Sequence, residues 1–261
     1  MQKGRCLQYE GGSDIISCNT FSGGFMQVHL RPRLLAAASF LAASHTVADI
    51  GCDHGRLSAA LVQRGLAKHV LASDISEDSL QKAKDLACRC GFSSEQLSFF
   101  VSDGLSHLVP GEADALVFAG MGGELIARLL EEGKEIAHSA KRIVMQPMGG
   151  TKELRKYLYE NGYGIKDETM VLDAGRYYQI LLASPNIGHS AEMPSDAILE
   201  FGAILFAKRD PLLREALIRC VEGRRRRMQR AEKNGVSPPQ LVHELTGADM
   251  LLSQFDQEEQ Q

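Results

Sequence analysis

Short apolar runs recur along the first two thirds of the chain and alternate with segments whose apolar residues follow helical spacing. The runs at 47–50, 70–73, 97–101, 115–119 and 143–145 each end at polar or glycine residues, so each predicts a buried strand. Because two parallel strands need a long crossover connection, this alternation predicts βαβ units and a parallel sheet.

Helical spacing occurs before the first of these runs and between most of the others. One helix is delimited with particular clarity, since Ser76 provides an N-cap and Gly91 a C-terminal stop. The predicted helices cover residues 34–41, 57–66, 77–90, 124–132 and 151–160.

Two further strands are predicted at 165–172 and 177–183, and only residues 173–176 join them. Such a short connection cannot be a parallel crossover, so these strands must pair antiparallel. The whole pattern predicts an α/β fold: a Rossmann-like, doubly wound sheet of seven strands, mostly parallel, with helices on both faces.

The last quarter of the chain has a different pattern. Residues 184–188 and Pro194 indicate a domain boundary, and residues 198–233 have helical spacing with a break at Pro211. A second helix at 240–255 is expected to run antiparallel to the first. We therefore expect a sheet domain at 26–187 and a coiled-coil-like helical domain at 192–261, and we expect the Gly- and Ser-rich residues 1–25 to be a disordered extension.

Composition narrows the class of protein. The chain has 261 residues, of which 44% are hydrophobic, and a formal net charge of −4, so nucleic acid could be held only by a local basic patch. No apolar run approaches the ~20 residues of a membrane helix, and no secretory signal is recognisable, so a cytoplasmic protein without membrane contact is expected. Six cysteines without paired C-x-x-C motifs favour neither a disulfide framework nor a metal site.

The candidate chemistry lies where the predicted strands end, because the ligand crevice of a doubly wound sheet lies at the carboxyl ends of its strands. Four turns there are rich in aspartate and glycine, at 49–55, 74, 103–104 and 120–123. Carboxylates would repel a pyrophosphate, and the usual phosphate-binding glycine motifs are missing. A ligand with a cationic end and a ribose fits better, and S-adenosylmethionine has both.

The same residues carry a family resemblance. Between about Leu30 and Ala183 the chain resembles the bacterial tRNA (adenine(22)-N(1))-methyltransferase family. The motifs that carry it are Ala48-Asp49-Ile50-Gly51-Cys52-Asp53-His54, Asp103-Gly104-Leu105, Asp114-Ala115, Ala119-Gly120-Met121-Gly122-Gly123-Glu124-Leu125-Ile126, Gln146-Pro147 and Leu158-Tyr159-Glu160-Asn161-Gly162-Tyr163. The chain departs from the family at Met148, where asparagine is usual, and at Arg56, where an aromatic residue is usual.

The resemblance implies a class I methyltransferase that uses S-adenosylmethionine to methylate N1 of an adenine at the D-arm of tRNA. It implies that Asp53 and His54 lie near the target base. The cofactor site that it implies consists of Asp49, Gly51, Asp74, Ile75, Asp103, Gly104, Gly120 and Met121.

Asp53 is the candidate catalytic residue because a carboxylate can offset the positive charge that N1 gains, or take a proton from the exocyclic amine. His54 could orient Asp53, receive a proton or contact RNA, and the sequence does not separate these roles.

A basic segment supplies the expected tRNA contact. The segment from Lys208 to Lys233 contains ten basic residues and four acidic ones. The residues expected to bind RNA phosphates are Arg224, Arg225, Arg226, Arg227 and Arg230. No protein partner is implied. Two alternatives stay open: methylation of another RNA or a small molecule, and an RNA-binding protein that keeps the cofactor fold without catalysis.

Overall fold

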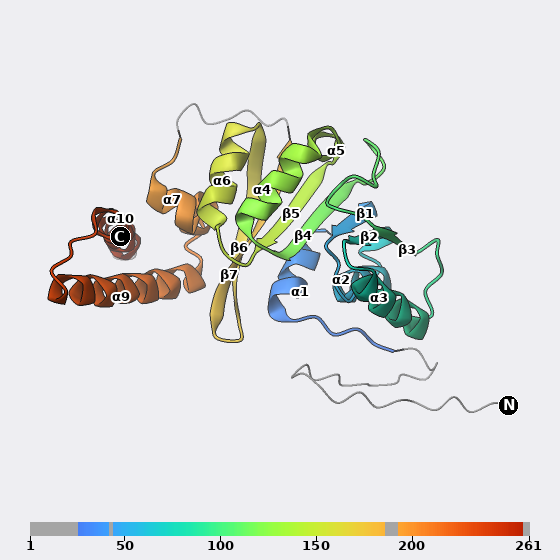
Figure 1. The fold of residues 1–261 in the computed structure, drawn as a ribbon, viewed down its shortest axis with the longest axis horizontal. Coiled ribbons are helices and arrows are strands. Elements are labelled where there is room, and N and C mark those ends of the chain that lie inside the picture. Colours follow the sequence, from blue (N-terminus) through green and yellow to red (C-terminus); the bar gives the residue numbers. More distant parts are fainter. Residues whose placement is uncertain (1–25, 42–43, 186–192, 258–261) are drawn as a thin grey trace.

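The computed structural model describes residues 26–41, 44–185 and 193–257, and its centre is a seven-stranded sheet (Figure 1). The strand order is β3-β2-β1-β4-β5-β7-β6, which confirms the doubly wound arrangement. The strands are β1 Ser44–Ile50, β2 Ala67–Asp74, β3 Leu97–Val101, β4 Ala115–Met121, β5 Arg142–Pro147, β6 Tyr163–Asp173 and β7 Arg176–Pro185.

Strand β7 runs antiparallel to both of its neighbours, β5 and β6, as the short loop before it requires. The parallel strands end together, because Ile50 of β1 lies opposite both Ser73 of β2 and Phe118 of β4. Their carboxyl ends therefore form one continuous edge of the sheet, where the aspartate and glycine turns gather.

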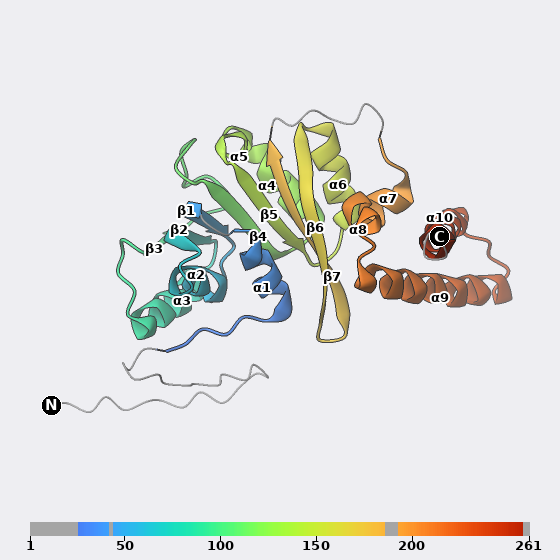
Figure 2. The same ribbon diagram turned by 180° about the vertical axis from the view of Figure 1, so that it is seen from behind.

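Helices cover both faces of the sheet (Figures 1 and 2). One apolar core contains residues of α4, α5 and α6, and the other contains residues of α1, α2 and α3. The helices of this domain are α1 Pro32–Ser39, α2 Arg56–Gln63, α3 Glu77–Cys90, α4 Gly123–Glu132, α5 Lys134–Ser139 and α6 Thr151–Glu160.

Two local details differ from the sequence-based expectation. Gly120 and Met121 belong to β4 and not to a loop, because Met121 pairs with Pro147 of β5 across an irregularity in register. The six-residue helix α5 was not predicted. It follows α4 after Gly133, where a Cβ atom would lie 2.5 Å from Cδ1 of Leu105, so glycine lets the chain approach the core there.

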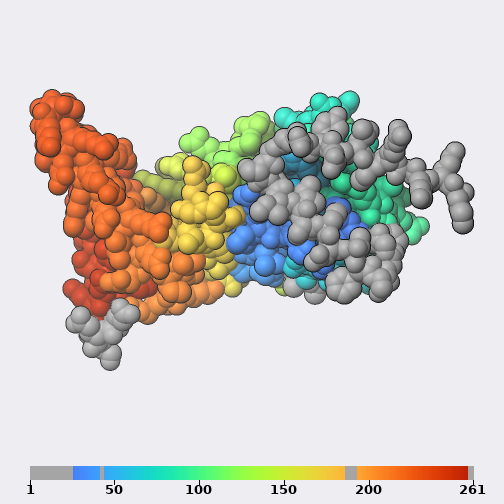
Figure 3. All heavy atoms as spheres, turned by 90° about the horizontal axis from the view of Figure 1, so that it is seen from below, coloured from blue at the N-terminus to red at the C-terminus, as the bar shows by residue number. Residues whose placement is uncertain are grey.

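The C-terminal helices form a separate cluster at one end of the elongated molecule (Figure 3). They are α7 Asp196–Phe201, α8 Ala203–Ala207, α9 Pro211–Lys233 and α10 Pro239–Gln257. The ion pair Arg214–Asp256 joins the start of α9 to the end of α10, and Arg225–Asp249 joins their middle parts. These helices therefore run antiparallel, as predicted. The segment has a break at Gly202 in addition to Pro211.

A buried polar network fastens this cluster to the sheet. Arg155 of α6 is 1% exposed, and its Nε donates to Oε1 of Glu168 in β6 at 2.8 Å. Its Nη1 donates to the carbonyl of Leu199 in α7 at 2.8 Å, and the second carboxylate oxygen of Glu168 accepts the Ile204 N–H of α8 at 3.0 Å. One ion pair thus satisfies backbone groups of both short helices.

The domain boundaries at 26–187 and 192–261 stay a prediction, and residues 1–25 and most of the connection between the two parts lie outside the described residues. No helix in the described ranges is long and apolar enough to cross a membrane.

Candidate active site

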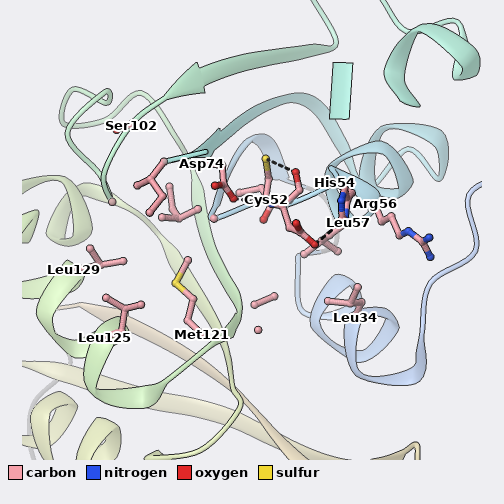
Figure 4. A pocket seen from close by; sticks show the side chains of 18 of the residues that line it. Leu34, Cys52, His54, Arg56, Leu57, Asp74, Ser102, Met121, Leu125 and Leu129 are labelled. Atoms are coloured by element: carbon pink, nitrogen blue, oxygen red, sulfur yellow. Dashed lines mark hydrogen bonds and ion pairs between the residues drawn. The ribbon is translucent and has the colours of Figure 1, made fainter. Parts of the chain in front are cut away.

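A pocket of about 630 Å³ opens at the carboxyl edge of the parallel strands (Figure 4). Every residue expected to bind a cofactor or to act in catalysis lines it, so the fold brings together turns that are up to about 70 positions apart in sequence. These residues are Asp49, Gly51, Asp53, His54, Asp74, Ile75, Asp103, Gly104, Gly120 and Met121.

The turn after β1 adopts a backbone conformation that few residues tolerate. Gly51 and Gly55 both have φ near +68°, and Asp53 between them has φ of +49°. A Cβ atom on Gly51 would lie 2.1 Å from the Cε atom of Met121, and one on Gly55 would lie 2.7 Å from the Cβ of Ala83. Glycine at these positions therefore lets the turn pack against β4 and α3.

Asp49 lies at the floor of the pocket with 2% of its surface exposed. Burial raises its pKa to about 6, although Ser58 opposes the shift by donating its hydroxyl to Oδ2 at 2.5 Å. A buried carboxylate favours a cation beside it, because the cation restores the stabilisation that solvent would otherwise provide.

Asp74 connects two of the turns. Its Oδ2 accepts the backbone N–H of Asp53 at 3.0 Å, and its Oδ1 accepts the N–H of Ser76 at 2.9 Å. Each oxygen keeps a second lone pair that can accept a hydroxyl of a ligand. Ile75, with 72% exposure, follows it on the pocket wall.

The turn after β3 supplies the third carboxylate. Asp103 is exposed and lines the pocket, while Gly104 is buried with φ of +57°. A Cβ atom on Gly104 would lie 2.7 Å from Cδ2 of Leu129 in α4. The glycine therefore allows the turn to pack against α4 and keeps Asp103 at the mouth of the pocket.

Asp53 and His54 contact each other at the open side of the pocket. The distance from Nδ1 of His54 to Oδ2 of Asp53 is 3.0 Å, and the two side chains are 46% and 69% exposed (Figure 4). The contact leaves the second oxygen of Asp53 able to accept a hydrogen bond from a ligand, and it favours the orienting role among those considered for His54.

Several lining residues were not singled out from the sequence. Arg33 and Leu34 come from the start of α1, and Leu125 and Leu129 come from α4. Only Leu125 belongs to one of the motifs quoted above, and a basic residue before an apolar helix gives no signal of a site by itself.

Of the two residues that depart from the family pattern, one lines the pocket and the other does not. Arg56 is the first residue of α2 and lines the pocket. Met148 is 45% exposed just beyond β5 and does not belong to the pocket wall, although its sulfur lies 3.8 Å from the amide nitrogen of Gln146.

The arginines of α9 do not form one uniform surface. Arg224 is only 8% exposed, and it binds Glu200 of α7 and the Glu244 carbonyl of α10. The structure therefore corrects its expected role: this guanidinium joins helices and is not available to RNA. Arg225 is exposed but paired with Asp249, and Arg226 is exposed with Glu222 3.9 Å away on the same helix. Arg227 and Arg230 are exposed along the helix.

Two further features bear on chemistry. Burial and the neighbouring aspartates raise the pKa of the Cys52 thiol far above its usual range, which disfavours the nucleophilic thiolate form. Within the described residues no group of three or more His, Cys, Asp or Glu side chains could hold a metal ion.

Comparison with known proteins agrees with this geometry. Residues 30–181 match the family model described as a methyltransferase domain. Over 157 residues the chain is 34% identical to the tRNA (adenine(22)-N(1))-methyltransferase of Bacillus subtilis, an alignment that covers 60% of this chain and 66% of that protein. It is 36% identical over 135 residues to a Mycoplasma pneumoniae protein proposed to be a tRNA methyltransferase, covering 51% of this chain and 60% of the relative. The chain thus spans slightly less than two thirds of the curated relatives that it matches.

Solved structures resemble the whole arrangement. A Streptococcus pneumoniae protein proposed to be a tRNA (m1A22) methyltransferase is 27% identical with a TM-score of 0.77, covering 86% of this chain and 100% of that one. The same protein in complex with S-adenosyl-L-methionine is 26% identical with a TM-score of 0.75 at the same coverage. Since the family model matches more than half of its length, including all the turns that form the pocket, this chain belongs to the methyltransferase-domain family.

Proposed function

We propose that this protein transfers the methyl group of S-adenosylmethionine to N1 of an adenine in tRNA, at position 22 in the D-arm. The observation that carries the proposal is the pocket with carboxylates at the ends of three neighbouring strands, within a segment that is 34% identical to a relative named for this reaction. We propose the cytoplasm as the place of action, since tRNA is found there.

The pocket residues fit the cofactor. Asp49 is a buried carboxylate suited to the cationic end, and Asp74 has lone pairs suited to ribose hydroxyls. Asp103, Gly104, Ile75, Gly120 and Met121 would complete the wall around it. When bound, the cofactor supplies an activated methyl group on a sulfonium, which needs no metal or covalent intermediate.

The protein itself then contributes by aligning the two reactants and by stabilising the charge that develops on N1. Methyl transfer to N1 is an in-line displacement, so holding the two reactants together supplies much of the acceleration. Apolar side chains of Leu34, Leu57 and Leu125 limit water around the reacting atoms. N1 gains positive charge as it reacts, and Asp53, fixed by His54, is the carboxylate that offsets it or takes a proton from the exocyclic amine.

The C-terminal helices would bind the body of the tRNA. Because N1 lies on the pairing edge of adenine, the base must be exposed, and the RNA needs anchoring elsewhere. Arg226, Arg227 and Arg230 are exposed along α9 and suited to phosphates, with Arg225 beside them. Arg224 is not part of this set because it is buried.

The test is transfer of labelled methyl from S-adenosylmethionine to bulk tRNA from a strain that lacks this protein, followed by mass analysis of the nucleosides. The expected product is 1-methyladenosine, absent when a tRNA transcript carries guanine at position 22. Methylation of another nucleoside would support a methyltransferase of different specificity. Cofactor binding without transfer to any tRNA would contradict the proposed substrate.

A further inference from the structure

Arg33 is held in the pocket by two side chains from distant parts of the chain. Its Nη1 donates to Oε1 of Gln146 at the end of β5, at 2.8 Å. Its Nε lies 3.6 Å from Oδ2 of Asp173, the last residue of β6. The Arg33 side chain, 21% exposed, is thus fixed where the edge of the pocket meets the β6–β7 hairpin.

Both holding side chains are buried. Gln146 is 0% exposed and Asp173 is 8% exposed, and Oδ2 of Asp173 has no hydrogen-bond partner among the described residues. Burial of an amide and a carboxylate is unfavourable unless they are paired. Here both are directed at one arginine that still reaches the pocket, which is the arrangement expected where a ligand-binding group must be held in a single orientation.

The guanidinium keeps donors for a ligand. Arginine has five N–H groups, of which the hydrogen bond to Gln146 uses one at Nη1, while Nε faces Asp173 at 3.6 Å. The backbone leaves space beside it, since a Cβ atom on Gly120 would lie 3.7 Å from Nη1. The ring of Tyr178 on β7 lies behind it, 6.0 Å from the guanidinium carbon.

Charge is distributed unevenly around the pocket. Asp49, Asp74 and Asp103 lie at the ends of β1, β2 and β3, whereas Arg33 lies beside the ends of β4 and β5. His29, Arg31, Arg56 and Arg128 also line the pocket. A cationic group therefore suits the three carboxylates, and an oxyanion suits the guanidinium of Arg33. The edge of adenine that becomes positive during methylation is not a suitable partner for Arg33.

We propose that Arg33 is the oxyanion-binding residue of this pocket, and that Gln146 and Asp173 are positioning residues that act through it. Resting on the proposed function, the oxyanion has two possible sources with the same chemistry. One is a phosphodiester of the RNA next to the target adenosine, and the other is the carboxylate of the amino-acid part of the cofactor.

The experiment compares Arg33→Met and Arg33→Lys with wild type, and uses Lys68→Met as the matched control, because Lys68 is an exposed cation at the amino end of β2. Three quantities are measured: KM and kcat for tRNA, the salt dependence of tRNA affinity, and the Kd values of S-adenosylhomocysteine and 5′-methylthioadenosine, which lacks the amino-acid part. Circular dichroism and 5′-methylthioadenosine binding establish that each variant is folded.

If the oxyanion is an RNA phosphate, Arg33→Met raises KM for tRNA roughly 10- to 100-fold and leaves S-adenosylhomocysteine affinity unchanged. The slope of log affinity against log salt then falls by about 0.7, as expected for one lost phosphate contact on unpaired RNA. If it is the cofactor's carboxylate, affinity for S-adenosylhomocysteine falls by a similar factor while that for 5′-methylthioadenosine does not. In either case Arg33→Lys restores part of the loss, and Asp173→Asn reproduces part of it.

Unchanged values for all three quantities in a folded Arg33→Met variant overturn the proposal, as does an equal effect of Lys68→Met. Failure of the proposed function is distinguishable, because it shows as the absence of tRNA methylation by the wild-type chain. The Kd values of S-adenosylhomocysteine and 5′-methylthioadenosine test the role of Arg33 independently of that result.

Discussion

Arg224 of α9 donates to both carboxylate oxygens of Glu200 in α7, at 2.7 and 2.8 Å. The main-chain carbonyl of Glu200 accepts Nη1 of Arg155, which pairs with Glu168 of the sheet. Hydrogen bonds therefore run without interruption from β6 through α6 and α7 to α9. The orientation of the C-terminal helices relative to the pocket is set by this chain of contacts.

Replacement of Arg224 by methionine is expected to destabilise the protein by roughly 1–3 kcal/mol, because Glu200 and the Glu244 carbonyl lose a charged donor. Urea unfolding followed by circular dichroism measures this difference. Arg226→Met is the matched control, since Arg226 is exposed on the same helix, and its effect on unfolding should be within about 0.5 kcal/mol. For tRNA affinity the two variants are expected to rank the other way. In folded protein Arg226→Met lowers the affinity more than Arg224→Met does, because the exposed Arg226 contacts the RNA directly. Equal effects of the two variants on stability would contradict the buried role of Arg224.

Glu168→Gln is expected to cost about 3–5 kcal/mol of unfolding free energy, since it leaves the fully buried Arg155 without its counter-charge. The same denaturant experiment measures it, with Glu160→Gln as the exposed control on α6. A loss below about 1 kcal/mol would show that the carbonyls of Leu199 and Glu200 suffice to hold Arg155.

Asp53→Ala is expected to lower kcat for tRNA methylation by about 10²- to 10³-fold, because the charge on the reacting base is no longer offset. Affinity for S-adenosylhomocysteine should stay within a few-fold of wild type, since the Asp53 carboxylate lies at the exposed side of the pocket. Asp85→Ala, an exposed residue of α3, is the control. Unchanged kcat would remove Asp53 from the mechanism, and lost cofactor affinity would assign it to the cofactor site.

Asp49 is expected to make both ligand affinity and stability depend on pH. Its pKa is raised by burial from 3.8 to about 6, so only about a tenth of the molecules carry this charge at pH 5. Affinity for S-adenosylhomocysteine, whose amino-acid part carries a cationic ammonium group, should therefore rise about tenfold between pH 5 and pH 7.5, as calorimetric titration can measure. Asp49→Asn should bind more weakly and lose this dependence.

The stability effect has the opposite direction. A carboxyl group whose pKa is higher in the folded state binds more protons when folded, so it contributes stability below pH 4 that is lost as pH rises towards 6. The loss is about 3 kcal/mol for a shift of this size. Denaturant unfolding of wild type and Asp49→Asn at pH 4 and pH 7 measures it, and a constant difference between the two proteins would refute the shift.

The order of strands and helices could be predicted because burial imposes a period on the sequence. Residues 77–90, 97–101 and 151–160 form the elements that their apolar spacing and caps predict, with the same boundaries. Helix α5 could not be predicted because six residues give too little periodicity. The break at Gly202 could not be predicted because its cause is spatial. A Cβ atom there would lie 2.7 Å from both the Arg155 guanidinium and the Glu168 carboxylate.

The sequence by itself determined the α/β fold, the four turns of the pocket and the aspartates within them, because the carboxyl ends of parallel strands must meet at one edge. Only the tertiary structure decided which basic residues are available. Arg33 lies among apolar helix residues in the sequence, yet contacts with Gln146 and Asp173, 113 and 140 positions away, hold it in the pocket. Arg224 lies in a run of four arginines, yet Glu200 and Glu244 bury it. The sequence shows which residues are charged, whereas the exposure and pairing of each charged side chain depend on which distant segments pack against it.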